Sequence, residues 1–181
     1  MKTSFEGISD NVTNIREGKY DALCTVKREH NETNVEFMTD FLMKFREKYN
    51  LEFEISSSSD PSDQFNIDTV RGKQLYKGIP LEPEPSIVLQ MLKAGMKISF
   101  ALCDVFSICD ASSISLPHKL SEIEMIEIIK NVKTIDVSSI EKVWYISDNA
   151  LYAVWSIKHG RYHSYVKEDG TIFSSQSMIR T

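Results

Sequence analysis

Basic and aromatic side chains near the carboxyl end of the chain are the residues with the clearest chemistry in this sequence. Between positions 161 and 167 they alternate, which is the spacing of side chains that share one face of a β-strand. Aromatic rings interleaved with cations on a sheet suit the stacking of bases and the neutralisation of phosphates, and they equally suit an acidic protein partner. The candidate binding residues are Tyr145, Tyr152, Lys158, Arg161, His163, Tyr165 and Lys167.

One of these residues, His163, could also take part in catalysis. An imidazole beside Arg161 and Tyr165 could act as general acid and base in a metal-independent cleavage of RNA, with a cation steadying the phosphate. Only closeness in the sequence supports this chemistry, so we assign no catalytic residue. A nucleic-acid-binding protein or a metal-independent ribonuclease using the same face is the alternative to a non-catalytic function.

The three cysteines, Cys24, Cys103 and Cys109, do not have the spacing of a zinc site. We expect them to be buried structural thiols, since free cysteine is often a core residue. The sequence has no Walker loop, glycine-rich dinucleotide turn, nucleophile elbow or zinc-protease pair. We therefore expect no metal and no cofactor.

Some aspartates also have chemistry to consider. Asp104 lies in the most apolar segment of the chain, where a buried carboxylate would need a partner, and a strand that ends early or a helix cap is the favoured explanation. Asp60, Asp63 and Asp68 lack the glycine and the alternating spacing of a calcium loop. We expect these three in a solvated loop.

Composition limits the class of protein. With 181 residues, 41% of them hydrophobic, the chain can form a globular domain with its own core. The net charge of -5 disfavours a basic nucleic-acid binder. No apolar run approaches the roughly 20 residues of a membrane helix, and the first residues lack the apolar stretch of a signal peptide. Together with the sparse cysteines, these features predict a soluble cytoplasmic protein without a membrane partner.

Three dipeptides suited to tight turns divide residues 143–175 into the strands of an antiparallel meander. They are Asp148-Asn149, His159-Gly160 and Asp169-Gly170. Two-residue loops at these positions place the tryptophans on one face, and the expected cross-strand pairs are Ile157 with Tyr162, Trp155 with Ser164, Ala153 with Val166, Ile146 with Leu151, Trp144 with Ala153 and Val166 with Phe173.

The opposite face then holds the candidate binding residues together with Val143, Val154, Ser156 and Ile172. Three interpretations of this face stay open. Tyrosine, lysine and arginine are ordinary occupants of the solvated side of a sheet, and the valines could be covered by a helix. The face could instead bind a protein, or bind a nucleic acid or a nucleotide.

The rest of the chain alternates between helical and strand patterns. We expect a helix over about 5–15, a strand over 20–27, a helix beginning at the capping box Thr33-Asn34-Val35-Glu36 and ending near Asn50, and a strand over 51–55. A polar, mobile loop over 56–64 follows, and residues 60–85 stay undetermined. A helix stopped by Gly95, a central strand over 98–106 and a helix over 121–132 complete the prediction.

We predict a single α+β domain spanning 1–181, with 1–57 as a candidate N-terminal subdomain and 121–176 as a C-terminal helix plus four-stranded meander. Two or three helices would pack on one face of the antiparallel sheet. Helices starting near Thr33 and Ser121 would cover the side chains of Trp144, Trp155, Tyr162 and Phe173. The predicted function is that of a non-catalytic binding or inhibitor protein whose macromolecular partner is a protein rather than a nucleic acid. A homodimer through the same face is an open alternative.

Overall fold

A computed structural model describes residues 12–17, 22–26, 32–58, 66–95, 98–132 and 137–177. The chain divides into two compact units, of which the first comprises Met1–Gly78 and Glu84–Ile108 and the second Ile79–Pro83 and Cys109–Thr181. The fold is a mixed α+β fold, as the sequence predicts. Neither helix in the described part of the chain has the length and apolar character needed to cross a membrane.

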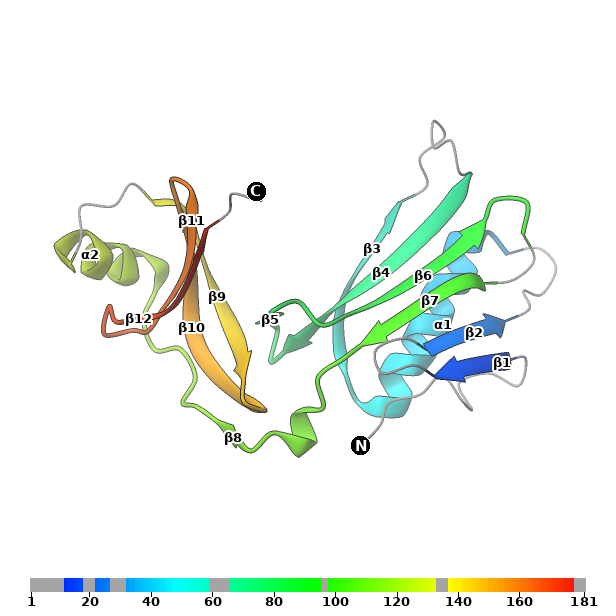
Figure 1. Cartoon of the computed structure of the whole chain (residues 1–181), viewed down its shortest axis with the longest axis horizontal. Helices are drawn as coiled ribbons and strands as arrows, with labels where there is room; N and C mark the ends of the chain where they lie inside the picture. The colour runs from blue at the N-terminus through cyan, green and yellow to red at the C-terminus, as the bar shows by residue number, and fades with distance from the viewer. Residues whose placement is uncertain are drawn as a thin grey trace. The chain divides into compact units, whose positions relative to one another are not determined.

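The first unit is a helix packed on an antiparallel sheet (Figure 1). Its elements are α1 (Asn34–Tyr49), β3 (Glu52–Ser58), β4 (Ile67–Tyr76), β6 (Ser86–Leu92) and β7 (Ile98–Asp104), and the strands pair in the order β3-β4-β6-β7. The predicted capping box is confirmed, because Thr33 and Glu36 exchange side-chain and backbone hydrogen bonds. The hydrogen bonds from Thr33 lower the pKa of Glu36. Asn50 ends the helix in the left-handed conformation, with φ of 50°, also as expected.

The core of this unit lies between α1 and one face of the sheet. The apolar stripe of α1 contributes Met38, Phe41, Leu42 and Phe45. The sheet contributes alternate residues of its strands, which share one face: Phe53, Val70, Ile87, Leu89, Met91 and Ala101. Helix α1 therefore covers the sheet of the first unit, and the expectation that it packs on the C-terminal meander is wrong.

Two predictions of helix in this unit are also wrong. Val12–Glu17 is a strand, β1, which pairs antiparallel with β2 (Ala22–Val26), while the rest of the expected helix over 5–15 lies outside the described residues. The strand predicted over 20–27 is confirmed as β2 over its described residues. Residues 86–92 form β6 rather than a helix. The spacing of their apolar residues fits both a helix and a strand. The segment forms a strand because it pairs antiparallel with β4 on one side and β7 on the other.

The segments around β6 differ from prediction in smaller ways. The strand predicted at 51–55 is present but extends through the serines to Ser58, so the expected loop does not begin at residue 56. Asp68 lies in β4 and is buried rather than solvated. Strand β7 pairs with β6 and ends at Asp104, whose exposed position fits the explanation that the strand ends early. The sequence predicts a central strand over 98–106, which would be covered on both faces, but Ser99 and Phe100 of β7 are exposed.

The second unit repeats the order of a helix followed by four antiparallel strands. Its elements are β5 (Ile79–Glu82), β8 (Ser113–Ile114), α2 (Glu122–Val132), β9 (Val137–Ser147), β10 (Ala150–His159), β11 (Tyr162–Val166) and β12 (Ile172–Ser177), with a 3-10 turn, η1 (Ile108–Asp110), ahead of β8. A second capping box opens α2, because Ser121 N donates to Glu124 Oε2 and Glu124 N donates to Ser121 Oγ. Two parallel pairings, β5 with β9 and β8 with β10, correct the prediction of a purely antiparallel sheet. The described residues contain two α-helices, one in each unit, so no third helix joins them there.

The turns set the register of the meander. Asp148 and Asn149 both have positive φ, and Ile146 and Trp144 pair with Leu151 and Ala153 as predicted. The second loop is Gly160-Arg161 rather than His159-Gly160, with positive φ at the glycine. Each pairing partner across this loop therefore moves by two residues, so that Ile157 pairs with Ser164. A shift of two keeps every side chain on its predicted face.

The third turn changes the faces of two residues. Gly170 N donates to Lys167 O and Lys167 N donates to Thr171 O, which makes the loop longer than the predicted dipeptide. Val166 consequently pairs with Ile172, and a bulge restores the pairing of Tyr165 with Ser174. Phe173 is the extra residue and packs with the tyrosines, whereas Ile172 shares the face of Val166. Both residues lie on the face opposite to the predicted one.

Helix α2 covers the tryptophan face of the second unit. Met125 and Ile129 of the helix pack with Trp155, Ile157 and Val166 of the sheet. This confirms the predicted packing of Trp155 against the helix that starts near Ser121. Tyr162 shares this face by register, and the sequence predicts it in the core. It is 53% exposed, so this prediction is wrong.

Candidate binding surface

The candidate binding surface is the face of the β9–β12 sheet opposite α2. Cross-strand pairing brings together Tyr145 with Tyr152, Val143 with Val154, Ser156 with Tyr165, and Lys158 with His163. Directly paired residues share a face, so these eight side chains lie on one side of the sheet. The structure thus places most of the predicted residues on a common face.

An aromatic cluster forms the middle of this surface. The ring of Tyr145 lies 4.4 Å from that of Tyr165 and 5.3 Å from that of Phe173, and Tyr152 lies 5.0 Å from Phe173. Beneath them Val143 and Val154 are fully buried. Tyr145, Tyr152 and Phe173 stay partly exposed, so this cluster is a packed apolar layer with an accessible upper edge.

Tyr165 does not fit the prediction of an accessible contact residue, because it is only 4% exposed. Its hydroxyl is hydrogen-bonded to the carboxylate of Glu82 on β5. Burial, the charge of Glu82 and neighbouring Tyr145 all raise the pKa of Tyr165. The side chain is therefore a neutral donor at physiological pH and positions Glu82. Sequence reasoning missed Glu82 because the segment that contains it stayed undetermined.

His163 lies toward the other end of the same face. Its Nε2 is 2.7 Å from Ser156 Oγ, and Ser156 is only 2% exposed. Burial lowers the pKa of His163, the charge of Lys158 adds to this effect, and Glu141 opposes it. The imidazole is therefore neutral near pH 7, but the serine hydroxyl beside it is too buried to attack a substrate.

Of the three predicted cations, Lys167 lies against the aromatic cluster. Lys158 and Lys167 are exposed, and Lys167 Nζ lies 5.7 Å from the centroid of the Phe173 ring. Arg161 belongs to the turn between β10 and β11, where it is exposed, rather than to a strand. The structure therefore gives the surface two accessible parts: Tyr145, Tyr152 and Lys167 with Phe173, and Lys158, Arg161 and His163.

The opposite face has its own histidine cluster. His159 Nε2 is 2.9 Å from Ser164 Oγ, which is 2.9 Å from Ser175 Oγ, and the His159 ring stacks on Tyr162. The sequence places His159 in a two-residue turn with Gly160, but in the structure it is the last residue of β10. Through these hydrogen bonds His159 links β10 to β11, and Ser164 links β11 to β12.

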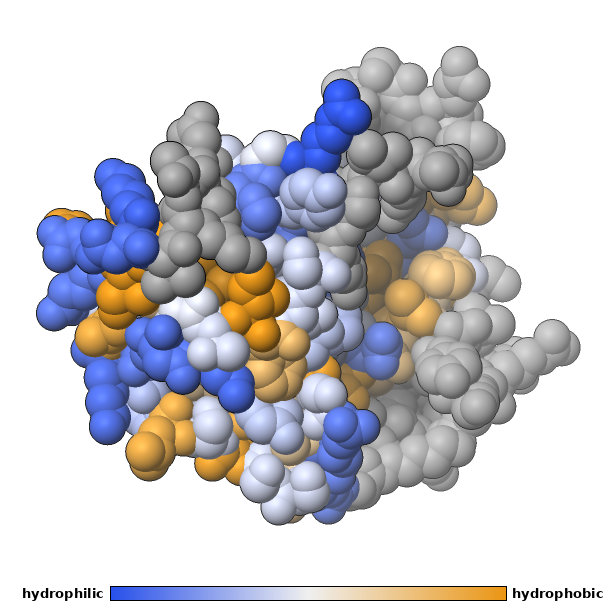
Figure 2. All heavy atoms as spheres, turned by 60° about the vertical axis from the view of Figure 1, so that its left-hand side comes forward, coloured by the Kyte–Doolittle hydropathy of each residue, from blue (hydrophilic) through white to orange (hydrophobic). Residues whose placement is uncertain are grey.

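Exposed apolar residues in the second unit come from several different elements. They include Ile114, Leu116, Ile123, Tyr162 and Ile172. On the side of the molecule that Figure 2 brings forward, hydrophobic residues form several groups separated by hydrophilic ones.

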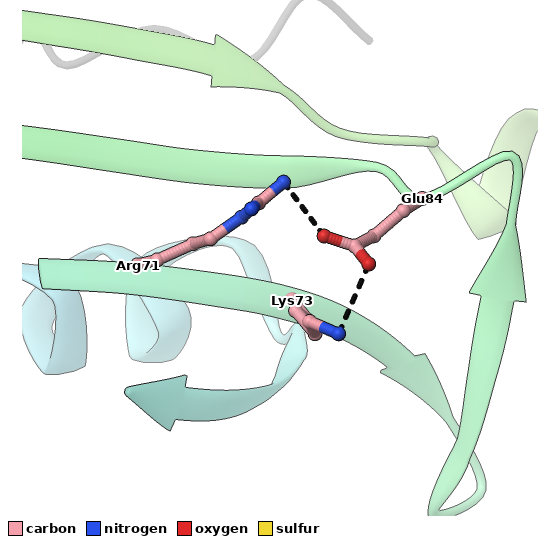
Figure 3. Close-up of polar contacts among 3 residues, drawn as sticks. All are labelled: Arg71, Lys73 and Glu84. Carbon is pink, nitrogen blue, oxygen red and sulfur yellow. Dashed lines mark ion pairs between the residues drawn. The ribbon is translucent and has the colours of Figure 1, made fainter. Parts of the chain in front are cut away.

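A charged cluster in the first unit was not predicted. Arg71 and Lys73, side by side on one face of β4, both point to Glu84 (Figure 3). Arg71 Nη2 lies 2.7 Å from Glu84 Oε1, and Lys73 Nζ lies 3.0 Å from Glu84 Oε2. The ion pair with Glu84 raises the pKa of Lys73. The cations are nearly half exposed, so the cluster contributes little to stability.

The predictions on cysteines and metals have separate outcomes. Cys103 is partly buried, but Cys109 is exposed, so the expectation of a buried thiol is wrong for Cys109. The side chain of Cys24 lies outside the described residues. No group of three or more His, Cys, Asp or Glu side chains within the described ranges is placed to hold a metal ion.

Comparisons with known proteins add little to this geometry. No family model matches the chain, and no curated protein matches it. Among solved structures, the chain is similar to the Bacillus megaterium YpeB C-terminal domain, with 12% sequence identity over 97% of this chain and 93% of that one and a TM-score of 0.45. A likeness at this level supports no argument about function.

Proposed function

We propose that this chain is a non-catalytic binding or inhibitor protein whose second unit engages a macromolecular partner through the face opposite α2. The observation that carries the proposal is the packed cluster of Tyr145, Tyr152 and Phe173 with the exposed Lys167 beside it. Rings already held by their neighbours lose little conformational freedom on binding, and tyrosine and arginine are the common energetic anchors of interfaces.

A protein with an acidic surface is the partner that this chemistry favours. Lys158, Arg161 and Lys167 project from the face or its turn, where they can reach carboxylates at the rim of an interface. The protein as a whole carries a net charge of -5, which weakens attraction to a polyanion such as nucleic acid. The sparse cysteine content fits a cytoplasmic location.

The burial of Ser156 argues against hydrolysis by a serine nucleophile on this face. The ribonuclease alternative would need His163 alone as acid and base, with Lys158 or Arg161 steadying the phosphate. A salt titration of binding to short single-stranded RNA separates the alternatives, because neutralised phosphates give a steep loss of affinity with salt. Our proposal expects no such binding and no cleavage.

The direct test compares the partners captured from the native cell by the wild-type protein and by Tyr152→Ala/Arg161→Ala. Glu127→Ala/Lys130→Ala on the exposed side of α2 is the matched control. We expect one partner to be lost from the first variant and kept by the control. Identical partner lists would remove the case for this face, and sedimentation of each purified variant tests the homodimer alternative.

A further inference from the structure

Residues 112–120 form a strap on the second unit, between η1 and α2. Ser112 N and Ser115 N donate to the carbonyl oxygens of Asn149 and Leu151, at 2.8 and 2.9 Å. Ala153 N donates in return to Ser115 Oγ at 2.7 Å. These bonds, with the parallel pairing of β8 and β10, cover the stretch of β10 that extends beyond its ladder with β11. The strap thus protects a strand edge.

The other end of the strap is held by Glu168 and by His118. Glu168 Oε1, in the turn between β11 and β12, accepts from Lys119 N at 2.6 Å and from Leu120 N at 2.9 Å. His118 Nε2 lies 3.2 Å from the carbonyl oxygen of Val143 on β9. Because a carbonyl oxygen only accepts, Nε2 carries the proton of the neutral ring and Nδ1 is bare.

His118 also contacts both tryptophans of the chain. Its ring centroid is 6.0 Å from that of Trp144 and 5.5 Å from that of Trp155, in edge-on arrangements. His118 Nδ1 and Trp155 Nε1 are both buried without a hydrogen-bond partner among the described residues. A proton added to Nδ1 would therefore place a buried, unsatisfied donor and a charge beside an indole that has only a donor to offer.

We propose that His118 is a pH-operated latch, whose neutral ring holds the strap over Trp144 and Trp155 and whose protonation releases it. Release uncovers the two indoles and opens the edge of β10 at residues 150–153. The latch is independent of the proposed function, because its residues lie on the α2 side of the sheet.

The charges around the latch set the pH at which it opens. Burial lowers the pKa of His118, while its hydrogen bond to Val143 opposes this effect. Lys142 of β9 lowers the pKa further, and Glu168 of the β11–β12 turn raises it. A histidine whose pKa is lower in the closed state than in the open state favours opening as pH falls below about 6.5.

Tryptophan fluorescence reads the latch directly, because the protein has two tryptophans and both lie against His118. Between about pH 7.5 and 5, we expect the wild-type emission to shift to longer wavelength and acrylamide quenching to increase, with the far-UV circular dichroism unchanged. His118→Gln keeps a donor for Val143 without the titration, so its emission should stay constant. The matched control His163→Gln removes a histidine on the opposite face of the sheet, so its emission should show the same red shift as wild type.

Two charge variants provide a second test, which remains valid even if His118→Gln does not fold into the closed state. Glu168→Gln keeps an accepting oxygen but removes the negative charge that stabilises the protonated ring in the closed state, so the midpoint, the pH at which half of the molecules are open, should move to higher pH. Lys142→Met removes a positive charge that disfavours the protonated ring in the closed state, so it should move the midpoint to lower pH. A wild type without a red shift, quenching of intensity alone, a transition that persists in His118→Gln, or equal midpoints in the two charge variants would each overturn the latch.

Discussion

At the scale of single residues, Asn34 joins three parts of the first unit. Its Nδ2 donates to Asp68 Oδ2 at 2.8 Å and to the carbonyl oxygen of Leu92 at 3.0 Å. Asn34 and Asp68 are both buried. A buried carboxylate held by a neutral amide depends on that amide for its solvation. The first helical residue of α1 is thereby tied to β4 and to the end of β6.

Asn34→Ala should therefore lower the free energy of unfolding by about 2–3 kcal/mol, because it leaves Asp68 buried with fewer donors. Urea denaturation measures the change. Thr33→Ala, one residue earlier, removes the exposed cap and should cost about 1 kcal/mol. If the two variants lost the same free energy of unfolding, the contact of Asn34 with Asp68 would add nothing beyond the helix cap, which would contradict this prediction.

The pKa of His163 predicts how stability depends on pH. Its folded value is lowered by burial and by Lys158, so the unfolded chain binds a proton more readily than the folded one. Stability is then fully present above the unfolded pKa of about 6.5 and falls as pH drops through it. Urea denaturation between about pH 8 and 5 should show a smaller fall in His163→Gln than in wild type. His118 has a shift of the same sign, so part of the fall should persist, and an unchanged slope in His163→Gln would contradict the assignment.

At the scale of elements, α1 approaches its sheet closely at Gly72. A Cβ added there would lie 2.8 Å from Leu42 Cδ2 and 3.3 Å from Phe53 Cγ. Gly72→Ala should lower the free energy of unfolding by about 1–3 kcal/mol through overpacking. The cost should be smaller in a Leu42→Ala background, where space exists, and a double-mutant cycle in urea measures the coupling. If the losses of the two single variants simply added in the double variant, Gly72→Ala would not press on Leu42, and α1 would move away from the sheet at no cost.

The bulge in the last hairpin makes a second prediction for an element. Phe173→Ala removes a ring that packs on Tyr145 and Tyr152, and it should cost about 2 kcal/mol. Ile172→Ala, at a 42% exposed position, should cost less than about 1 kcal/mol. Thermal or urea unfolding compares them. A larger loss for Ile172→Ala than for Phe173→Ala would contradict the bulge and support the faces that a two-residue loop predicts.

Local signals account for the elements that the sequence predicts well. Thr33-Glu36 and Ser121-Glu124 mark both helix starts because capping depends on neighbouring residues alone. The tyrosine face is predicted despite the shifted second turn, because a shift of two residues preserves the side of every side chain. The failures lie where distant pairing decides, as in β6, or where one extra residue changes the face, as at Phe173.

At the scale of the whole molecule, two units share one plan, in which a capped helix covers one face of four strands that pair in chain order. The sequence did not reveal this, because the strands of the first unit included one with an ambiguous period and one in the undetermined segment. Exposure on the second unit could not be predicted either. Accessibility of a tyrosine depends on its neighbours in space, and Tyr165 is buried by residues of other strands.

The central claim is that the second unit binds its partner through the face opposite α2. Site-specific photocrosslinking tests it most directly, with a photoreactive residue at Lys158 on that face or at Lys130, an exposed lysine of α2. In the native cell, we expect an adduct of one defined mass from position 158 and none of that mass from position 130. Adducts from position 130 alone, or the same adducts from both positions, would contradict the claim.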